Sequence, residues 1–537
     1  MMFMAKNNLK KLSCYLIMIA LSTPLITSCN PDAVEEGDYS SITNGLLTAT
    51  VDGQTMYFVP STENANELMV TWNRTDLSWD RLQELIGNDG GLQTYKGTII
   101  VPEQVTINGT TYRVSGIDAY AFAGNQNLDT LTIPDGISYI NPRALTKSGI
   151  IKLKLPSNVT EISDGMLAGM SRLTNVSLPA SVTKIDSRAF YGSTGIKSIN
   201  ATACTSVTTI GDYCFYGCSA LENIQLPNSI KTFGNQVFVG CSSLTSFTIP
   251  DFMEEIPVGM FNGCSNLATV AVNQGTSQLK TIRNSAFMSC KSLTSFTIPN
   301  SLITLESRAF NGCSGLQELV IDQSNSLLSQ IGDSAFYNCS ALASLTLPNA
   351  LTSIGNYAFS GCNAIKTVTA DQTSCQLKTI GIRAFYGSSS AKMTSFILPN
   401  ATTSIGAHAF QSKRSLTTIN INAASSKLEA IADSAFYDCR ALTNVILPEQ
   451  LKSIASYAFY YNSKLTTLTV PASVTTLGAD IFKSSGMKTL HVKWNTPIAL
   501  TEDFINCGTS CKVYIPSGSL SSYQAADIWK TYTLIEE

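Results

Sequence analysis

The chain has 537 residues, of which only 14% are charged, and its formal net charge is −3. A chain of this length is longer than one ordinary globular core. Its middle shows no change of composition, which favours an array of repeats over several unlike domains. Nucleic-acid binding depends on concentrated Lys and Arg, so the charge balance argues against a nucleic-acid partner.

Residues 1–28 have the pattern of an export signal. Lys10 and Lys11 precede an apolar run that is too short to span a bilayer and is broken by Pro24. The residues before Cys29 are Leu-Ile-Thr-Ser, and this ending resembles the lipobox of bacterial lipoproteins. The resemblance implies cleavage before Cys29 and lipidation of that residue, so we expect an anchor in the bacterial outer membrane. The alternative is an ordinary secretory signal followed by a chance cysteine.

An acidic tether, residues 29–39, follows the signal and contains Asp32, Glu35, Glu36 and Asp38. Such a stretch is similar to the signal that displays Bacteroidetes-type lipoproteins on the outer surface. We therefore expect the chain to face the cell exterior, with the lipid as its only contact with the membrane. Display on the periplasmic face is the alternative.

Residues 40–98 lack the repeat that follows them and predict a small β-rich head. Asp52-Gly53 can supply the positive φ of a tight turn, which predicts a hairpin over 45–59. Helical spacing after a possible Ser cap predicts a helix over 78–86. We expect the head to cover the first repeat, because an uncapped end would leave an apolar face and an open strand edge in water.

Residues 99–491 repeat one pattern, which is clearest over 287–310. Phe296 lies between polar Ser295 and Thr297, as in a short strand with one buried face, and a proline then ends the strand. A single unit cannot bury its own apolar face, so stacked copies must do it. The recurring Phe marks a period of 22–26 residues. We expect Phe and Cys to form ladders along one core, with Phe238, Cys241, Phe287, Cys290, Phe310, Cys313, Phe336 and Cys339 as members.

The repeated pattern AF-x-G-C-x-x-L-x-x-[IVF]-x-[IL]-P looks like the BspA-type leucine-rich repeat of bacterial surface proteins. The pattern predicts a β-rich repeat solenoid, a coil of about 17 turns that each give one strand to a parallel sheet. Residues 492–537 abandon the repeat and resemble the closing segment of such proteins. We expect them to form a C-terminal cap, with a last strand at 512–515 and a short helix that ends near Trp529.

Eight of the fifteen cysteines recur three residues after a ladder Phe. Zinc sites need clustered Cys and His, and the chain has only two histidines, so we expect neither a metal site nor another cofactor. A ladder of small, buried, apolar side chains explains the recurring cysteines. Cys507 and Cys511 lie near the C-terminus of a chain that is expected to be exported, and whether they form a disulfide stays open.

Two sets of side chains are candidates for binding. The outward strand positions are neutral and polar and lack aromatic or Arg anchors, so β-propensity and solubility are the simpler explanation for them. Tyrosines that directly follow the ladder Phe should lie along one flank, where packing against the next turn is the alternative. The candidates are Asn223, Gln225, Ser246, Thr248, Ser295, Thr297, Ser344 and Thr346 on the strands, and Tyr337, Tyr386 and Tyr437 on the flank.

No catalytic motif of the GxSxG, HExxH or phosphate-loop type occurs, so we expect a binding protein rather than an enzyme. The family resemblance implies that a monomer binds extracellular host proteins, such as fibronectin or fibrinogen, or the surface of another cell. The alternative is a surface glycan-binding protein of a polysaccharide-uptake system, with Trp72 and Trp79 of the head as stacking rings. A glycan-active enzyme that uses paired carboxylates comes third.

Overall fold

Two units make up the chain in the computed structural model, Met1–Gly45 and Leu46–Glu537. The structure describes residues 46–61, 64, 66–72, 95–500 and 511–537, all of which belong to the second unit. The predicted signal, the acidic tether, Cys29 and the helix expected over 78–86 lie outside these residues. Within the described residues, no helix is long and apolar enough to cross a membrane.

The described part begins with the hairpin that Asp52-Gly53 predicts. β1 (Leu47–Val51) and β2 (Gln54–Pro60) pair antiparallel. The φ angles at the turn are 49° at Asp52 and 75° at Gly53, in the left-handed region that this residue pair tolerates. Local turn chemistry therefore sets this hairpin.

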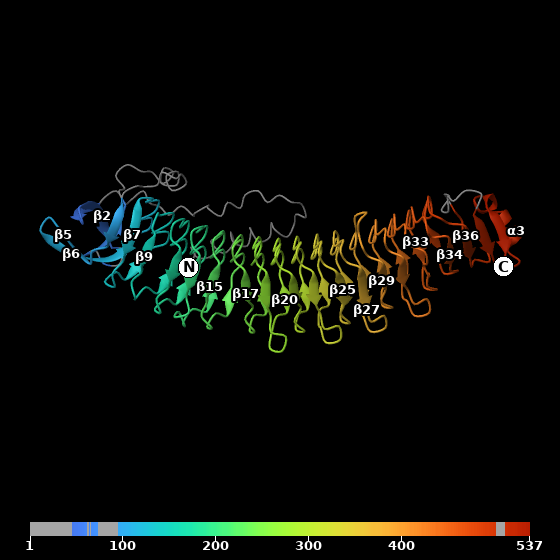
Figure 1. Cartoon of the computed structure of the whole chain (residues 1–537), viewed down its shortest axis with the longest axis horizontal. Helices are drawn as coiled ribbons and strands as arrows, with labels where there is room; N and C mark the ends of the chain where they lie inside the picture. The colour runs from blue at the N-terminus through green and yellow to red at the C-terminus, as the bar shows by residue number, and fades with distance from the viewer. Residues whose placement is uncertain (1–45, 62–63, 65, 73–94, 501–510) are drawn as a thin grey trace, which may run out of the picture. The chain divides into compact units, whose positions relative to one another are not determined.

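The head passes into the repeats through a shared sheet (Figure 1). β3 (Glu67–Thr71) pairs antiparallel with β2 and parallel with β6 (Thr110–Ile117). On its other edge, β6 pairs antiparallel with β5 (Gln104–Ile107) near its start and parallel with β8 (Tyr139–Ile140) near its end. Because β8 belongs to the first turns of the repeat, the antiparallel head changes to parallel stacking at β6.

Most turns of the repeats contain two short strands, not the single strand that the sequence predicts. The first strand carries the predicted alternation, as in β21 (Ser295–Thr297). In the turn of residues 437–459 the first strand is reduced to an isolated bridge between Asn444 and Thr418. The second strand has only two residues and follows the proline turn, as in β22 (Thr304–Leu305). A strand with one buried residue cannot display an alternation of period two, so the second strand leaves no recognisable signal in the sequence.

The first strands of successive turns stack in parallel and so do the second strands. The first strands are β4 (Gly97–Ile100), β7 (Leu128–Thr132), β9 (Lys152–Lys154), β11 (Asn175–Ser177), β13 (Ser198–Asn200), β15 (Asn223–Gln225), β17 (Ser246–Thr248), β19 (Thr269–Ala271), β21, β23 (Glu318–Val320), β25 (Ser344–Leu347), β27 (Thr367–Ala370), β29 (Ser395–Ile397), β31 (Thr418–Asn420), β34 (Thr467–Val470) and β36 (Thr489–Val492). The second strands are β8, β10 (Glu161–Ile162), β12 (Lys184–Ile185), β14 (Thr209–Ile210), β16 (Thr232–Phe233), β18 (Glu255–Ile256), β20 (Thr281–Ile282), β22, β24 (Gln330–Ile331), β26 (Ser353–Ile354), β28 (Thr379–Ile380), β30 (Ser404–Ile405), β32 (Ala430–Ile431), β33 (Ser453–Ile454) and β35 (Thr476–Leu477).

The second strands form the longest sheet of the described residues, ten parallel strands from β18 to β35. Its register places Ile282 beside Leu305 and Leu305 beside Ile331, so like residues share one row. The first strands divide into shorter sheets, among them β11-β13-β15 and β17-β19. Both series are interrupted at the same place. The turn that contains β15 and β16 is followed by the turn that contains β17 and β18, and in the described structure neither β15–β17 nor β16–β18 is paired.

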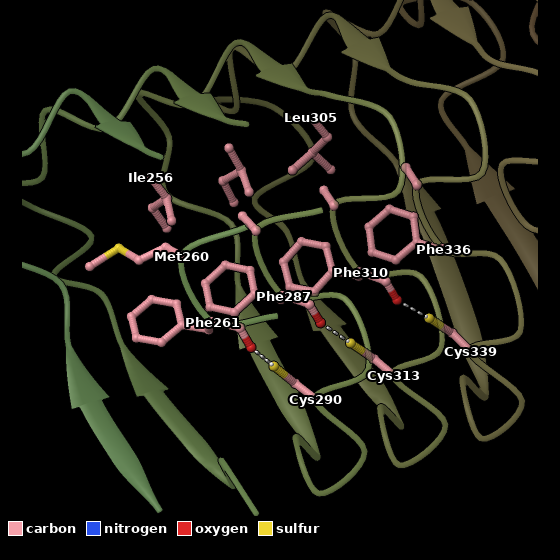
Figure 2. Close-up of a cluster of buried hydrophobic side chains, with 14 of the residues drawn as sticks. Ile256, Met260, Phe261, Phe287, Cys290, Leu305, Phe310, Cys313, Phe336 and Cys339 are labelled. Carbon is pink, nitrogen blue, oxygen red and sulfur yellow. Dashed lines mark hydrogen bonds between the residues drawn. The ribbon is translucent and has the colours of Figure 1, made fainter. Parts of the chain in front are cut away.

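The predicted phenylalanine ladder forms the core (Figure 2). The rings of Phe261, Phe287, Phe310 and Phe336 are fully buried, and successive centroids lie 5.3, 4.9 and 5.2 Å apart in near-parallel stacks. Ladder rings stack in this way from Phe190 to Phe482, so the core is a row that runs through these turns, and Leu145 and Leu167 take the place of Phe in two earlier turns. This arrangement confirms the repeat solenoid predicted from the sequence.

The C-terminal cap continues the first-strand stack. β37 (Lys512–Ile515) pairs in parallel with β36, and β38 (Thr533–Glu536) pairs with β37. α3 (Leu520–Gln524) and the 3-10 turn η1 (Trp529–Thr531) lie between these two strands in the chain. The Tyr523 hydroxyl donates to the Trp494 carbonyl oxygen at 2.8 Å, and both residues are buried. The expected strand at 512–515 is present, but it is not the last one, because β38 follows it. The expected short helix is also present, but it ends at Gln524, and a separate 3-10 turn begins at Trp529.

Candidate functional site

The ladder cysteines are hydrogen-bond donors as well as buried apolar residues. Sγ of Cys290 donates to the carbonyl oxygen of Phe261 at 3.1 Å, and Sγ of Cys313 donates to that of Phe287 at 3.0 Å (Figure 2). Burial raises the pKa of the Cys218 and Cys439 thiols to about 12. A protonated, buried thiol is a poor nucleophile, so this ladder is structural. Groups of three or more His, Cys, Asp or Glu that could hold a metal are absent from the described residues.

One turn places a lysine in the cysteine ladder. Lys413 stands three residues after Phe410 and is 1% exposed, and its aliphatic chain packs near Gly387. Burial lowers the pKa of Lys413 to about 8. Its charge therefore carries a desolvation cost that the other ladder positions avoid. Cys511 is buried, and Cys507 lies outside the described residues, so their disulfide stays an open prediction.

The outward strand positions lie on the surface, as their alternation predicts. Asn223, Gln225, Ser246, Thr248, Ser295 and Ser344 are exposed, and Thr297 and Thr346 are half-buried. Hydroxyls on this face bond to one another, as between Thr346 and Thr369 at 3.3 Å. Such contacts satisfy the polar groups across the stack and offer no anchor of the kind that dominates binding.

The tyrosine flank is also present, and its rings pack partly on their neighbours. Tyr337, Tyr386 and Tyr437 are half-buried. The Arg383 guanidinium lies 5.7 Å from the ring centroid of Tyr357 and 5.9 Å from that of Tyr386. These rings are therefore partly packed and partly exposed, and their role in binding stays a prediction.

Four tyrosines gather at one place on this flank, and with Arg440 we call them the tyrosine patch: Tyr437, Tyr457, Tyr460, Tyr461 and Arg440. The rings of Tyr437 and Tyr460 stack at 5.0 Å, and Tyr461 meets Tyr460 edge-on at 4.7 Å. Tyr457 is 39% exposed and Tyr461 is 42% exposed. Large exposed rings on one small area are unusual for this otherwise neutral surface.

Charged groups hold the arginine of the tyrosine patch in place. The buried carboxylate of Asp438 accepts from Nε of Arg440 at 2.6 Å and pairs with a guanidinium nitrogen of Arg414 at 2.7 Å. The Arg440 guanidinium lies 5.9 Å from the ring centroid of Tyr461. The cation and the ring are thus oriented before any partner arrives.

The backbone at Tyr461 is strained for a bulky residue. Its φ is 59°, in the left-handed region, and the equivalent position of other turns is often glycine, as at Gly217 and Gly240. Left-handed φ angles recur at this position along the repeats, as at Ser289 and Asn338, so the angle belongs to the turn, and Tyr461 is unusual only in placing a large side chain there. Sequence reasoning missed Tyr457 and Tyr461, although the adjacent Tyr460-Tyr461 pair in a glycine position was a usable signal.

A cleft of about 700 Å³ opens where both strand series are interrupted. Its walls include three of the predicted strand residues, Asn223, Ser246 and Thr248, but not Gln225. Ile224 and Phe247 line it and are half-buried, whereas Phe296 at the equivalent position of another turn is 1% exposed. The other predicted strand residues lie on turns away from this cleft.

The repeats match a known family. The BspA type leucine rich repeat region matches residues 103–205, 200–281, 280–393 and 378–510, in six copies. These matches cover most of the chain, so it belongs to the BspA-type leucine-rich repeat family. Proteins of this repeat class are generally binding scaffolds. No curated protein matches the chain.

Several solved structures are similar to the chain at low sequence identity. A leucine-rich repeat protein from Bacteroides ovatus is 21% identical, with 90% of this chain and 98% of that chain covered and a TM-score of 0.48. A leucine-rich cell surface protein from Faecalibacterium prausnitzii is 20% identical, with 91% and 98% covered and a TM-score of 0.35. The pneumococcal vaccine antigen PcpA is 15% identical, with 91% and 98% covered and a TM-score of 0.26.

Proposed function

We propose that the protein is an adhesin, displayed on the bacterial outer membrane by a lipid on Cys29, that binds an extracellular host protein or the surface of another cell. The observation that carries the proposal is the tyrosine patch. Tyr and Arg are enriched at the few positions that supply most binding energy in protein interfaces. The outward strand positions lack such residues, so recognition is assigned to the patch.

The geometry of the patch suits a protein partner. The stacked rings of Tyr437 and Tyr460 are already ordered, so little side-chain entropy is lost on binding. Tyr457 and Tyr461 combine apolar ring faces with hydroxyls, so they can contact both the apolar and the polar groups of a protein partner. Arg440 adds a fixed cation at the edge.

The glycan alternative depends on exposed aromatic rings, and the tryptophans give it little support. Trp72 is 7% exposed, Trp494 is 6% exposed and Trp529 is 1% exposed. Their rings are committed to packing, and Trp79 lies outside the described residues. Aromatic rings of the tyrosine patch could also stack on sugars, so the test below includes glycans as well as proteins.

The test probes arrays of extracellular proteins and of glycans with the soluble chain 30–537. A double variant, Tyr457→Ala with Tyr461→Ala, removes the exposed rings, and Tyr213→Ala, at the same place in an earlier turn as Tyr457, is the matched control. We expect proteins to be retained by the wild type and the control and lost by the double variant. Retention of glycans alone would contradict the adhesin proposal.

The anchor is tested separately, on protein extracted from the native membrane. We expect mass spectrometry of the N-terminal peptide to show Cys29 as the first residue with added acyl mass. An unmodified Cys29 would refute lipidation but would leave the binding test unaffected. Protease treatment of intact cells then separates exterior from periplasmic display, because only an exterior chain is digested.

A further inference from the structure

We propose that the cleft between the turn of β15 and β16 and the turn of β17 and β18 binds an extended peptide that adds a strand to the opened sheet. This site is distinct from the tyrosine patch, and neither proposal depends on the other.

The backbone ladder of the first strands is missing at this point. In regular turns an N–H at the end of the strand donates to the next turn, as from Ala201 to the Gln225 oxygen at 2.8 Å and from Ile249 to the Ala271 oxygen at 2.9 Å. The equivalent pair, the Leu226 N–H and the Thr248 carbonyl, forms no hydrogen bond in the described structure. Both walls therefore present strand edges, which are templates for another chain.

The same gap continues into the second strands, and a proline explains it. Gly234 donates its N–H to the Ile210 oxygen at 2.8 Å, and Arg283 donates to the Ile256 oxygen at 3.0 Å. The residue between them in this series is Pro257, which has no N–H to donate to the Phe233 oxygen. The ten-stranded sheet accordingly begins only at β18.

Bulky rings hold the two turns apart on the cleft side. Phe233 occupies a position that is Ile or Leu in many turns, and its ring meets Phe247 edge-on at 6.1 Å. Phe252 at the rim is 37% exposed. The apolar walls and the unpaired strand edges together fit an extended peptide whose alternate side chains are apolar.

The turns stay joined on the opposite side, so the cleft is built into an intact stack. Phe215 donates its N–H to the Val237 oxygen at 2.9 Å, and Gly217 donates to the Val239 oxygen at 2.7 Å. The rings of Phe215 and Phe238 remain stacked at 5.4 Å. A volume of about 700 Å³ lies within the range of specific ligand sites.

The test selects a phage-displayed library of random peptides of about ten residues, the length of one long strand, on the immobilised chain 30–537. The variant Thr248→Arg fills the cleft from an exposed position, and Thr369→Arg makes the same change in a regular turn. We expect enriched peptides with alternating apolar residues, whose affinity falls about tenfold or more for Thr248→Arg and is unchanged for Thr369→Arg.

A second measurement separates strand addition from side-chain binding. N-methylation of every second backbone nitrogen of an enriched peptide removes the donors on one edge, and methylation of the other set removes those on the opposite edge. Because both walls offer strand edges, we expect each set to weaken binding about tenfold or more. No enrichment, enrichment insensitive to Thr248→Arg, or binding that tolerates both methylated forms would each overturn the proposal. Loss of the tyrosine patch should leave peptide binding intact.

Discussion

In many turns the side chain three residues after the ladder phenylalanine donates a hydrogen bond to the turn before it. Cys313 donates to the Phe287 oxygen, and Ser193 makes the same bond to the Leu167 oxygen at 2.6 Å. The recurrence of cysteine predicts burial, and burial is found. The hydrogen bond was not predicted, because a sequence pattern shows which residues recur but not which carbonyl lies opposite.

Lys413 gives the clearest prediction at this scale. Its pKa of about 8 in the folded chain is below its ordinary value of 10.5, so the unfolded chain binds more protons between these pH values. The contribution of Lys413 to stability should therefore rise from about pH 8 to about pH 10.5, and its charge costs about 3 kcal/mol below this window. The buried ladder thiols, whose pKa is raised, act in the opposite direction above about pH 9, but they do so equally in the wild type and in a Lys413 variant, so the effect of the lysine is the difference between the two proteins. Lys413→Met should raise the free energy of unfolding at pH 7 and flatten this rise.

Urea titrations at pH 7 and pH 10 measure both effects, with exposed Lys427→Met as the control. Methionine already fills the equivalent position at Met170, which is fully buried. The same pH dependence in the wild type and in Lys413→Met would show that the lysine is not the cause.

The ladder thiols give a second prediction. Cys218 and Cys439 are buried, and burial raises the pKa of each thiol to about 12, so neither should react with a thiol reagent in the native chain at pH 8. In urea both should react fully, which serves as the internal control. Mass spectrometry of labelled peptides checks this outcome, and rapid labelling of either cysteine in the native chain would contradict it.

At the scale of the strand, alternation predicted the first strands well and the second strands not at all. Phe296 is 1% exposed between the outward Ser295 and half-buried Thr297, as their order implies. The two-residue strands appear only when neighbouring turns pair, so they are a property of the stack. The cleft was not predicted for the same reason. In the sequence Pro257 resembles the other turn prolines, and only the pairing of neighbouring turns shows that it stands where an N–H donor is needed.

Pro257→Ala tests the cause of the interruption between β16 and β18. Alanine occupies the equivalent position at Ala432 and Ala455, where each N–H donates to the preceding turn. The variant should gain a bond to the Phe233 oxygen, and the amides of β18 should become more protected from hydrogen exchange by about tenfold or more. Unchanged protection would mean that the rings of Phe233 and Phe247 alone keep the turns apart.

At the scale of the whole chain, the period of 22–26 residues was enough to predict the solenoid, because each turn buries its core against the next. The head hairpin and the strand at 512–515 were also predictable from local signals, whereas β38 was not predicted. The tyrosine patch was predicted only in part. Tyr437 and Tyr460 follow a ladder phenylalanine, so their positions could be predicted. The grouping of four rings in one area could not be predicted, because it depends on the handedness and rise of the coil.

A stack of repeats predicts unfolding in parts when its middle is weakened. Phe310→Ala removes a ring that packs between Phe287 and Phe336, at a cost of about 3–5 kcal/mol. The tryptophans lie near the two ends, so their fluorescence reports the ends, while circular dichroism reports the repeats. We expect the two signals to separate in urea for Phe310→Ala and to coincide more closely in the wild type. Coincident transitions in both proteins would contradict unfolding in parts.

The most direct test of the account is the affinity of a retained protein partner for the wild type and for the Tyr457→Ala, Tyr461→Ala variant. Surface plasmon resonance on the soluble chain 30–537 measures it, with circular dichroism to confirm that the variant is folded. If the tyrosine patch supplies the main contact, the variant should bind about 30-fold or more weakly, the loss expected for a dominant aromatic anchor. Equal affinity of the two proteins would contradict the assignment of recognition to the tyrosine patch.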